Sequence, residues 1–385
     1  MSDENQKKYT YFITGGGTGG HIYPAIAIAD ALLKDSSTQD IYYIGNPKNL
    51  EFEISKQKGY KFLDINIQGM PREFGLKCIK WLINLMIASI KCKFYISKYK
   101  PDAIIGTGGY VSAPPLLAAM LFARGGKHRV PFMLHDCDAM PGLVTRKFSS
   151  DAAAVSLAFE VAKDYIKNKN IFVNGNPIRD KFKTLSKENA RENLGLKNKL
   201  TLCVMGGSQG ARTINDATVE LLKFLSQEKD MQIIFQTGKK NFERVIEQLI
   251  RIYPNYESDK NLIVRPYFDD MVSVLKASDI AVSRAGSLSL SEICASGLAS
   301  ILIPYPHAAS DHQRKNAKYM VDTGAALYIE DSEITKQSLK QAVLSLTDDE
   351  DKLKNLQENA LKLAKFDGTE KIISQLKQIA DGELK

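Results

Sequence analysis

The chain has 385 residues, of which 44 % are hydrophobic and 25 % charged, and its formal net charge is +8. This length allows two domains of ordinary size, and the composition excludes a disordered chain. We expect no signal peptide, because the first eight residues are polar or charged except for the initial methionine. The five cysteines show neither paired nor metal-ligand spacing, which is typical of a protein in a reducing cytosol.

In chain order, the first half alternates buried-type strands with helices, a pattern that favours an α/β fold with a parallel sheet. The predicted elements are a strand at Tyr9–Thr14, a helix at Pro24–Leu33 and strands at Ile41–Ile44, Asp102–Gly106, Val130–Leu134, Ala152–Ser156 and Ile171–Val173.

A further helix is expected at Lys77–Tyr99, where apolar residues recur at three- and four-residue spacing and lysines flank them. A helix packed into the domain with a solvated basic side would show this pattern, and so would a helix lying on an anionic membrane surface. Trp81, Leu82 and Leu85 widen the apolar stripe, which favours peripheral membrane contact. We find no nucleic-acid recognition motif in the sequence. We therefore expect the positive charge to interact with a partner other than nucleic acid.

The same alternation begins again after Gly175-Asn176-Pro177. We therefore expect a first Rossmann-like domain at residues 1–177 and a second at 178–365, with the C-terminal segment 366–385 packing back on the first domain or on the second. The predicted strands of the second domain are Leu200–Met205, Met231–Gln236, Leu262–Arg265, Ile280–Ser283, Ser300–Pro304 and Ala326–Ile329, and the predicted helices include Lys187–Leu194, Ala211–Leu225 and Thr369–Ile379.

Three glycine clusters follow predicted strands, at Gly15–Gly20, Gly106–Gly109 and Gly206–Gly210. Glycines there let the backbone approach a phosphate group, and the N–H groups at the next helix start point at the anion. None of the clusters is a Walker loop or a regular dinucleotide fingerprint, so ATP hydrolysis and NAD binding are not favoured. Three such turns in two similar halves favour a phosphate-bearing ligand over ligand-free turns.

Two side chains near these turns have both a structural and a functional interpretation. His21 follows the first cluster and is either a residue that caps the helix start or a general base. Glu292 is expected in the first turn of a helix capped by Ser287 or Ser289, where it either compensates the helix dipole or accepts the hydroxyls of a ribose.

Seven motifs in order then resemble the MurG family, the N-acetylglucosaminyltransferases of peptidoglycan synthesis, over nearly the whole chain. They are Gly16-Gly-Thr18-Gly-Gly-His21, Gly106-x-Gly-Gly-Tyr110-Val-Ser112, Gly175-Asn-Pro-x-Arg179, Gly206-Gly-Ser-Gln-Gly-Ala211, Asp269-Asp-Met271, Ser283-Arg-x-Gly286 with Ser291-Glu292, and Asp311-His-Gln313-x-x-Asn316-Ala317.

The resemblance implies a GT-B fold, in which two Rossmann-like domains face a cleft. It implies an inverting transfer of N-acetylglucosamine from UDP-N-acetylglucosamine to lipid I, with no metal and no other cofactor, at the cytoplasmic face of the inner membrane. The departing diphosphate would be stabilised by helix starts.

The family's site residues carry over by position. Thr18 and His21 would lie at the reacting centre, with His21 as the base, beside Gly17, Gly19 and Gly20. For the donor, the resemblance implies contacts from Arg179 and Ser208 to the diphosphate, from Phe268 and Met271 to uracil, from Ser287, Leu288 and Ser289 to the phosphates, from Glu292 to the ribose, and from His312, Gln313 and Asn316 to sugar hydroxyls.

One motif departs from the family, which usually has His-Glu-Gln-Asn where this chain has His135-Asp136-Cys137-Asp138. Asp136 shortens the acid by one methylene, and Asp138 replaces an amide expected to contact the donor sugar. A carboxylate cannot donate a hydrogen bond as an amide does, so this departure leaves open which donor sugar is bound or how its acetyl group is recognised. The spelling Asp-x-Asp also occurs in metal-dependent glycosyltransferases, but that class lacks the double-Rossmann pattern.

Three alternatives remain open from the sequence. A UDP-N-acetylglucosamine 2-epimerase shares the fold and the donor but has no use for the basic-apolar segment. A transferase acting on another lipid is kept open by the His135–Asp138 departure. A non-enzymatic nucleotide-sugar sensor would bind without turnover.

Overall fold

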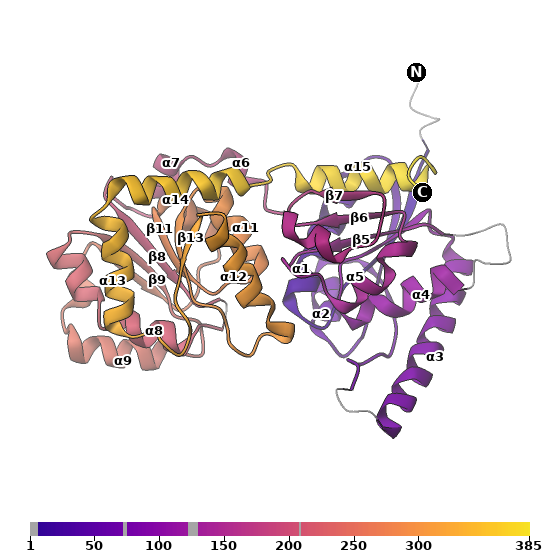
Figure 1. Cartoon of the computed structure of the whole chain (residues 1–385), viewed down its shortest axis with the longest axis horizontal. Helices are drawn as coiled ribbons and strands as arrows, with labels where there is room; N and C mark the ends of the chain where they lie inside the picture. The colour runs from indigo at the N-terminus through magenta and orange to yellow at the C-terminus, as the bar shows by residue number, and fades with distance from the viewer. Residues whose placement is uncertain (1–6, 72–74, 122–129, 208) are drawn as a thin grey trace, which may run out of the picture. The chain divides into compact units, whose positions relative to one another are not determined.

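The computed structural model describes residues 7–71, 75–121, 130–207 and 209–385. Contacts divide the chain into two units, Met1–Pro177 with Asp367–Lys385, and Ile178–Phe366. Each unit is a parallel sheet with helices on both faces (Figure 1). This confirms the predicted α/β class with two Rossmann-like sheets.

The first unit has a seven-stranded sheet in the order β3-β2-β1-β4-β5-β6-β7. The chain moves one way from β1 to β3 and then returns to continue on the other side, so the strand order reverses between β1 and β4. The strands are β1 (Tyr9–Thr14), β2 (Thr38–Gly45), β3 (Lys61–Asp64), β4 (Ala103–Gly106), β5 (Phe132–Asp136), β6 (Ala154–Leu157) and β7 (Ile171–Val173). The helices are α1 (Gly19–Lys34), α2 (Leu50–Lys58), α3 (Leu76–Tyr99), α4 (Ala113–Leu121), α5 (Leu143–Phe148) and α15 (Gly368–Ala380).

Alternate residues of β1 enter two different cores, as the two-residue period of a strand requires. Tyr11 and Ile13 pack with residues of α1 and α15, whereas Phe12 packs with residues of α3 and α4. The C-terminal helix α15 therefore completes the first unit, against α1 and the β4–β6 face (Figure 1).

The second unit has a six-stranded parallel sheet in the order β10-β9-β8-β11-β12-β13, with its reversal between β8 and β11. Its strands are β8 (Thr201–Met205), β9 (Gln232–Gln236), β10 (Leu262–Arg265), β11 (Ile280–Ser283), β12 (Ala299–Leu302) and β13 (Ala326–Tyr328). Its helices are α6 (Lys181–Thr184), α7 (Lys187–Asn193), α8 (Arg212–Val219), α9 (Phe242–Ile252), α10 (Met271–Ala277), α11 (Ser287–Ser296), α12 (His312–Asp322), α13 (Lys336–Thr347) and α14 (Glu350–Leu363).

Two predicted helices have other bounds in the structure, and one strand was not predicted. The first helix begins at Gly19, so that Pro24 lies inside it rather than at its start. The helix predicted over Ala211–Leu225 ends at Val219 and is followed by a separate π-helical turn at Phe224–Glu228. The edge strand β3 was missed, because it is short and its two end residues are exposed and charged.

The helix expected at Lys77–Tyr99 forms as α3, and most of its apolar residues are exposed. Only Ala88, Ser89 and Cys92 of this helix are buried, against α4. The exposed side chains include Leu76, Ile79, Leu82, Ile83, Met86, Ile87, Ile90 and Phe94. Figure 1 shows α3 projecting from the sheet of its unit. Across the described ranges, no helix has the length and apolar character needed to cross a bilayer.

Candidate functional site

In the first unit, the predicted site residues gather where the strand order reverses. The turn after β1 carries Gly17 and Thr18, and α1 then starts at Gly19 and Gly20. Thr18 is the exposed N-cap residue of α1, and its side chain makes no capping hydrogen bond. Ligands of open α/β sheets bind at such a reversal, beyond the carboxyl ends of the strands.

His21 lies in the first turn of α1 and is oriented by the turn after β4. Its Nδ1 atom is 3.2 Å from the carbonyl oxygen of Thr107, and the Thr107 hydroxyl donates to the His21 carbonyl at 2.7 Å. A carbonyl oxygen only accepts, so Nδ1 carries the proton and the lone pair of the neutral ring is on Nε2. The side chain thus reaches across to the turn after β4, in a tautomer whose Nε2 atom can act as a base.

The glycines of both turns are required by close packing. A Cβ atom on Gly108, which has φ +99°, would lie 2.7 Å from His21 Nδ1. A Cβ atom on Gly109 would lie 2.0 Å from the carbonyl oxygen of Gly16. The two glycine clusters of the first unit therefore pack on each other around the His21 ring.

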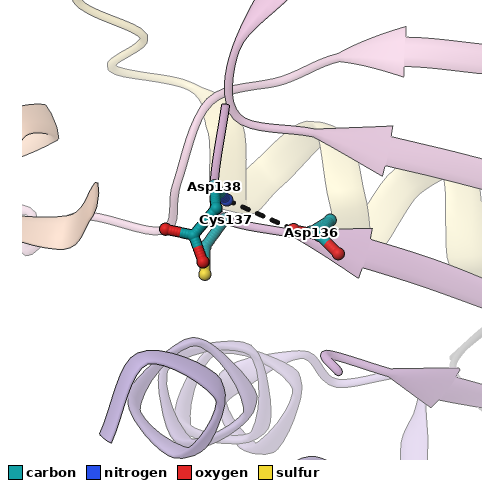
Figure 2. Close-up of side chains that lie close together, drawn as sticks. All are labelled: Asp136, Cys137 and Asp138. Carbon is teal, nitrogen blue, oxygen red and sulfur yellow. Dashed lines mark hydrogen bonds between the residues drawn. The ribbon is translucent and has the colours of Figure 1, made fainter. Parts of the chain in front are cut away.

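Asp136 and Asp138 lie at the end of β5, the strand next to β4. Asp136 is buried, and its two oxygens accept from the N–H groups of Asp138 at 3.2 Å and Gly142 at 2.9 Å. Burial raises the pKa of Asp136 to about 7, helped by the Asp138 charge and opposed by these hydrogen bonds. Figure 2 shows the Asp136 carboxylate turned toward the Asp138 amide.

Cys137 connects this turn to the start of α1. Pro24 has no N–H to offer the carbonyl of Gly20, and the Cys137 thiol donates to that carbonyl at 3.2 Å. The ligand atoms of Asp136, Cys137 and Asp138 lie within 4.8 Å of one another, a grouping that a metal ion could use. Because both oxygens of Asp136 already accept backbone hydrogen bonds, we interpret its carboxylate as a clamp on the turn.

The second unit has a pocket of about 630 Å³ at its own strand reversal. It lies beyond the carboxyl ends of β8, β11 and β12, where the third glycine cluster and the start of α11 meet. Its lining comprises Gly206, Gly207, Gln209, Gly210, Ala211, Arg212, Thr213, Ser283, Arg284, Gly286, Ser289, Tyr305, Pro306, His307, Gln313 and Asp331. Two helix starts at one pocket suit a diphosphate.

Five of the predicted donor residues lie in the first two turns of α11 or pair with a residue there. Gly286 is the N-cap of α11, so Ser287, Leu288 and Ser289 form the first turn and direct their N–H groups out of the helix start. Glu292 lies in the second turn, and its predicted place in the first turn was wrong. Its carboxylate pairs with Arg179, with Nη2 and Oε1 2.8 Å apart.

Gln313 and Asn316 hold the loop after β11 in place. Gln313 Oε1 accepts from the N–H groups of Ala285 at 3.2 Å and Tyr305 at 3.0 Å. The buried Asn316 donates to the Ala285 carbonyl at 3.2 Å. His312 contacts the Ala309 carbonyl through Nδ1 at 2.6 Å. Of these three predicted sugar contacts, Gln313 alone belongs to the lining of the described pocket.

The remaining predicted donor residues are Phe268, Met271 and Ser208. Phe268 is buried, and its N–H already donates to Gln236 Oε1 at 3.0 Å. Met271 begins α10. Ser208 lies outside the described residues, and the structure gives no account of it.

The pocket also contains side chains to which the sequence analysis assigned no role. Arg284 donates to Asp331 at 2.5 Å and to the carbonyls of Ile303 and Pro304, and Thr213 donates to Asp331 at 2.7 Å. Arg284 stands in a quoted motif and could have been assigned from it. Thr213 and Asp331 carry no sequence signal, because they meet only in the folded unit.

Comparison with known proteins agrees with this geometry. Residues 11–157 match the glycosyltransferase family 28 N-terminal domain, and residues 201–375 match its C-terminal domain. A protein of Thermoanaerobacter sp. (strain X514) is 37 % identical over 371 residues, 96 % of this chain and 99 % of its own length. A protein of Desulforamulus reducens is 39 % identical over 369 residues, 95 % of this chain and 98 % of its own. Both are named UDP-N-acetylglucosamine–N-acetylmuramyl-(pentapeptide) pyrophosphoryl-undecaprenol N-acetylglucosamine transferase.

Solved structures extend the likeness to the fold. MurG of Acinetobacter baumannii superposes with a TM-score of 0.77 at 25 % identity, covering 96 % of this chain and 99 % of that one. UDP-GlcNAc 2-epimerase from Neisseria meningitidis shares the fold, with a TM-score of 0.64 at 12 % identity over 96 % of this chain and 99 % of its own.

Fold and domain matches together define a glycosyltransferase with two parallel-sheet domains. The chain belongs to glycosyltransferase family 28 and, within it, to the MurG family.

Proposed function

We propose that the chain transfers N-acetylglucosamine from UDP-N-acetylglucosamine to lipid I and so makes the β-1,4-linked disaccharide lipid II. The observation that carries this proposal is the identity of 37 % and 39 % to enzymes named for this transfer, over 96 % and 95 % of the chain. These alignments span both units of the chain, and so they include the regions expected to bind the donor and the acceptor.

The donor would bind in the second unit. The pocket between the third glycine cluster and α11 offers backbone N–H groups to a diphosphate, and their dipoles are fixed before the leaving group gains charge. Glu292, close to that helix start, would accept the ribose hydroxyls. The transfer then needs no metal, because the fixed N–H dipoles stabilise the negative charge that develops on the departing diphosphate.

The acceptor would bind in the first unit, at the turn that carries Thr18 and His21. A hydroxyl of the muramyl sugar attacks the anomeric carbon, the bond from that carbon to the UDP oxygen breaks, and the configuration inverts. The hydroxyl proton passes to His21 Nε2, whose lone pair is fixed by the Nδ1 contact to Thr107.

The chain would work at an anionic membrane surface, at the cytoplasmic face of the inner membrane. Its lipid acceptor stays in the bilayer, and α3 presents exposed apolar side chains beside lysines, as a helix lying in the interface does. Attachment is peripheral.

A transfer assay tests the proposal. Purified chain is incubated with UDP-N-acetylglucosamine in lipid I vesicles, in vesicles lacking lipid I, and in lipid I vesicles with excess chelator. We expect UDP release that requires lipid I and persists with chelator. Release without lipid I, accompanied by the 2-epimer of the donor sugar, would identify an epimerase instead. Loss of activity with chelator that manganese restores would contradict the metal-free mechanism.

A further inference from the structure

The C-terminal helix α15 is held tightly to the segment that leaves the first unit. Its first residue, Gly368, packs on the backbone of Asn174, where an added Cβ atom would lie 2.5 Å from the Asn174 carbonyl oxygen. Figure 1 shows α15 running past the β6 and β7 side of the sheet, and α15 packs on the face formed by β4, β5 and β6. A residue larger than glycine at this point would separate helix and segment.

About two turns further along α15, the same two segments are joined by a buried pair of amides. Asn174 Nδ2 donates to Gln375 Oε1 at 2.7 Å, and Gln375 Nε2 faces Asn174 Oδ1 at 3.4 Å. Asn174 is 3 % exposed and Gln375 9 %. A buried amide that loses its partner pays a desolvation cost, so each member of the pair fixes the other.

The pair continues into the sheet toward the end of β5 and the turn that follows it, residues His135–Asp138. Asn174 Nδ2 also donates to Ser156 Oγ at 3.0 Å, and Ser156 Oγ lies 3.1 Å from His135 Nδ1. His135 is completely buried, and burial lowers its pKa to about 4, so its ring is neutral at neutral pH. A neutral imidazole has one donor and one acceptor nitrogen. The hydrogen bond with Ser156 Oγ therefore helps to determine which of these two roles His135 Nδ1 takes.

Directly after His135 come Asp136, the last residue of β5, and Asp138 in the turn that follows. Asn176, two residues after Asn174, donates to the carbonyl of Cys137 at 3.3 Å, so the turn is held from both ends. The network thus runs from α15 through the segment after β7 and through β6 to β5. Networks whose members come from several elements specify one arrangement of those elements.

We propose that Gln375 is a positioning residue for the substrate site: through Asn174 and Ser156 it fixes the His135 ring, and thereby the turn that carries Asp136 and Asp138. The inference rests on the proposed function and on the expectation from the sequence that Asp138 stands at a position of donor-sugar contact, next to the Asp136 clamp. The C-terminal helix then positions residues of the first unit's site, in addition to packing in the core of that unit.

The experiment compares Gln375→Leu with Gln378→Leu in the full-length chain. Gln378 is an exposed residue of the same helix and is the matched control. The first readout is the ¹⁵N spectrum of the histidine rings, with the His135 signals assigned from a His135→Gln variant. We expect Gln375→Leu to shift the ring signals of His135 and to leave those of His312 unchanged, while Gln378→Leu shifts neither.

The second readout is turnover of UDP-N-acetylglucosamine with lipid I. We expect Gln375→Leu to lower kcat roughly ten- to a hundredfold, because small displacements of a site cost that much, with UDP affinity unchanged. Ser156→Ala interrupts the network nearer to His135 and leaves α15 in place. It should lower kcat similarly, and the double variant should be little worse than either single one.

Unchanged His135 signals in Gln375→Leu would overturn the proposal, whatever the activity. So would losses of Gln375→Leu and Ser156→Ala that simply multiply in the double variant, since that result indicates independent destabilisation. If the unaltered chain transfers no sugar, the proposed function fails, and the histidine spectrum still tests the link from Gln375 to His135.

Discussion

Arg179 and Glu292 form an ion pair that joins the segment after Pro177 to the second turn of α11, with Nη2 and Oε1 2.8 Å apart. Burial raises the pKa of the Glu292 carboxyl above its ordinary value, and the charge of Arg179 opposes that shift. Two residues that the sequence assigned separately to UDP therefore act on each other. Arg179 holds the carboxylate in one orientation while leaving Oε2 for a ligand.

Glu292→Ala should weaken UDP binding by roughly 1–3 kcal/mol, the cost of losing a buried pair of ribose hydrogen bonds. Stability should fall by less than about 1 kcal/mol, because the ion pair is partly exposed. Calorimetry with UDP measures the first effect. Lys181→Ala, which breaks the comparable pair with Asp270, is the control and should keep its UDP affinity. Unchanged affinity in a folded Glu292→Ala variant would remove Glu292 from the site.

His21→Asn separates proton transfer from structural support. The Asn amide can still donate to the Thr107 carbonyl, as Nδ1 does, but it has no nitrogen that takes a proton. Turnover should fall by about 10²–10⁴-fold, the usual contribution of a positioned base. UDP affinity and melting temperature should change little. Near-normal turnover of His21→Asn would show that the ring only orients the turn.

The pKa of Asp136, raised to about 7 by burial and by the Asp138 charge, gives the first unit a pH dependence. Between the ordinary carboxyl range and pH 7, the unfolded chain has released this proton and the folded chain retains it, so stability from this group falls as pH rises. Above pH 7 both carboxylates are charged. Asp138→Asn removes that repulsion and should stabilise the protein by about 1 kcal/mol at pH 8, or roughly 2–4 °C.

At pH 5 the gain from Asp138→Asn should be smaller, since Asp136 is then protonated. Melting curves at the two pH values measure this difference. Asp164→Asn, an exposed substitution with the same change in net charge, is the control and should show no such dependence. An equal gain at both pH values would mean that Asp136 is ionised throughout.

Membrane binding should depend on α3. Ile87 and Phe94 are 60 % and 63 % exposed, and burying each in an interface contributes roughly 1.5–3 kcal/mol. Ile87→Glu and Phe94→Glu should each reduce binding to phosphatidylglycerol vesicles about tenfold or more, measured by co-sedimentation. Ile250→Glu, at a position on α9 that is 49 % exposed, is the control. Equal binding by all three variants would place the membrane contact elsewhere.

The strands were predicted well where a buried apolar run ends in glycine or at a turn. Tyr9–Thr14 and Ile280–Ser283 have the predicted bounds. The start of α1 was missed, because Gly19 and Gly20 are poor helix formers and Pro24 suits a first helical position. Tertiary contacts of His21 with Thr107 overcome that local preference.

Parts of the site follow from sequence and others do not. The glycine turns could be predicted from the sequence, because the strand, the glycines and the helix start are contiguous in the chain. The place of Glu292 depended on which residue caps α11, and Gly286 does so in place of a serine. Gln375 and Asn174 are 201 residues apart in the chain, and no local pattern relates them. Only packing of α15 on the first unit brings their amides together.

A competition assay tests the central claim most directly. The purified chain receives equal amounts of UDP-N-acetylglucosamine, UDP-N-acetylgalactosamine and UDP-glucose, with lipid I and diacylglycerol together in one anionic vesicle, and the lipids are analysed by mass spectrometry and digestion. We predict that lipid I gains one β-linked N-acetylglucosamine and that diacylglycerol gains no sugar. Sugar on diacylglycerol, or lipid I left unmodified while a donor is consumed, would contradict the account.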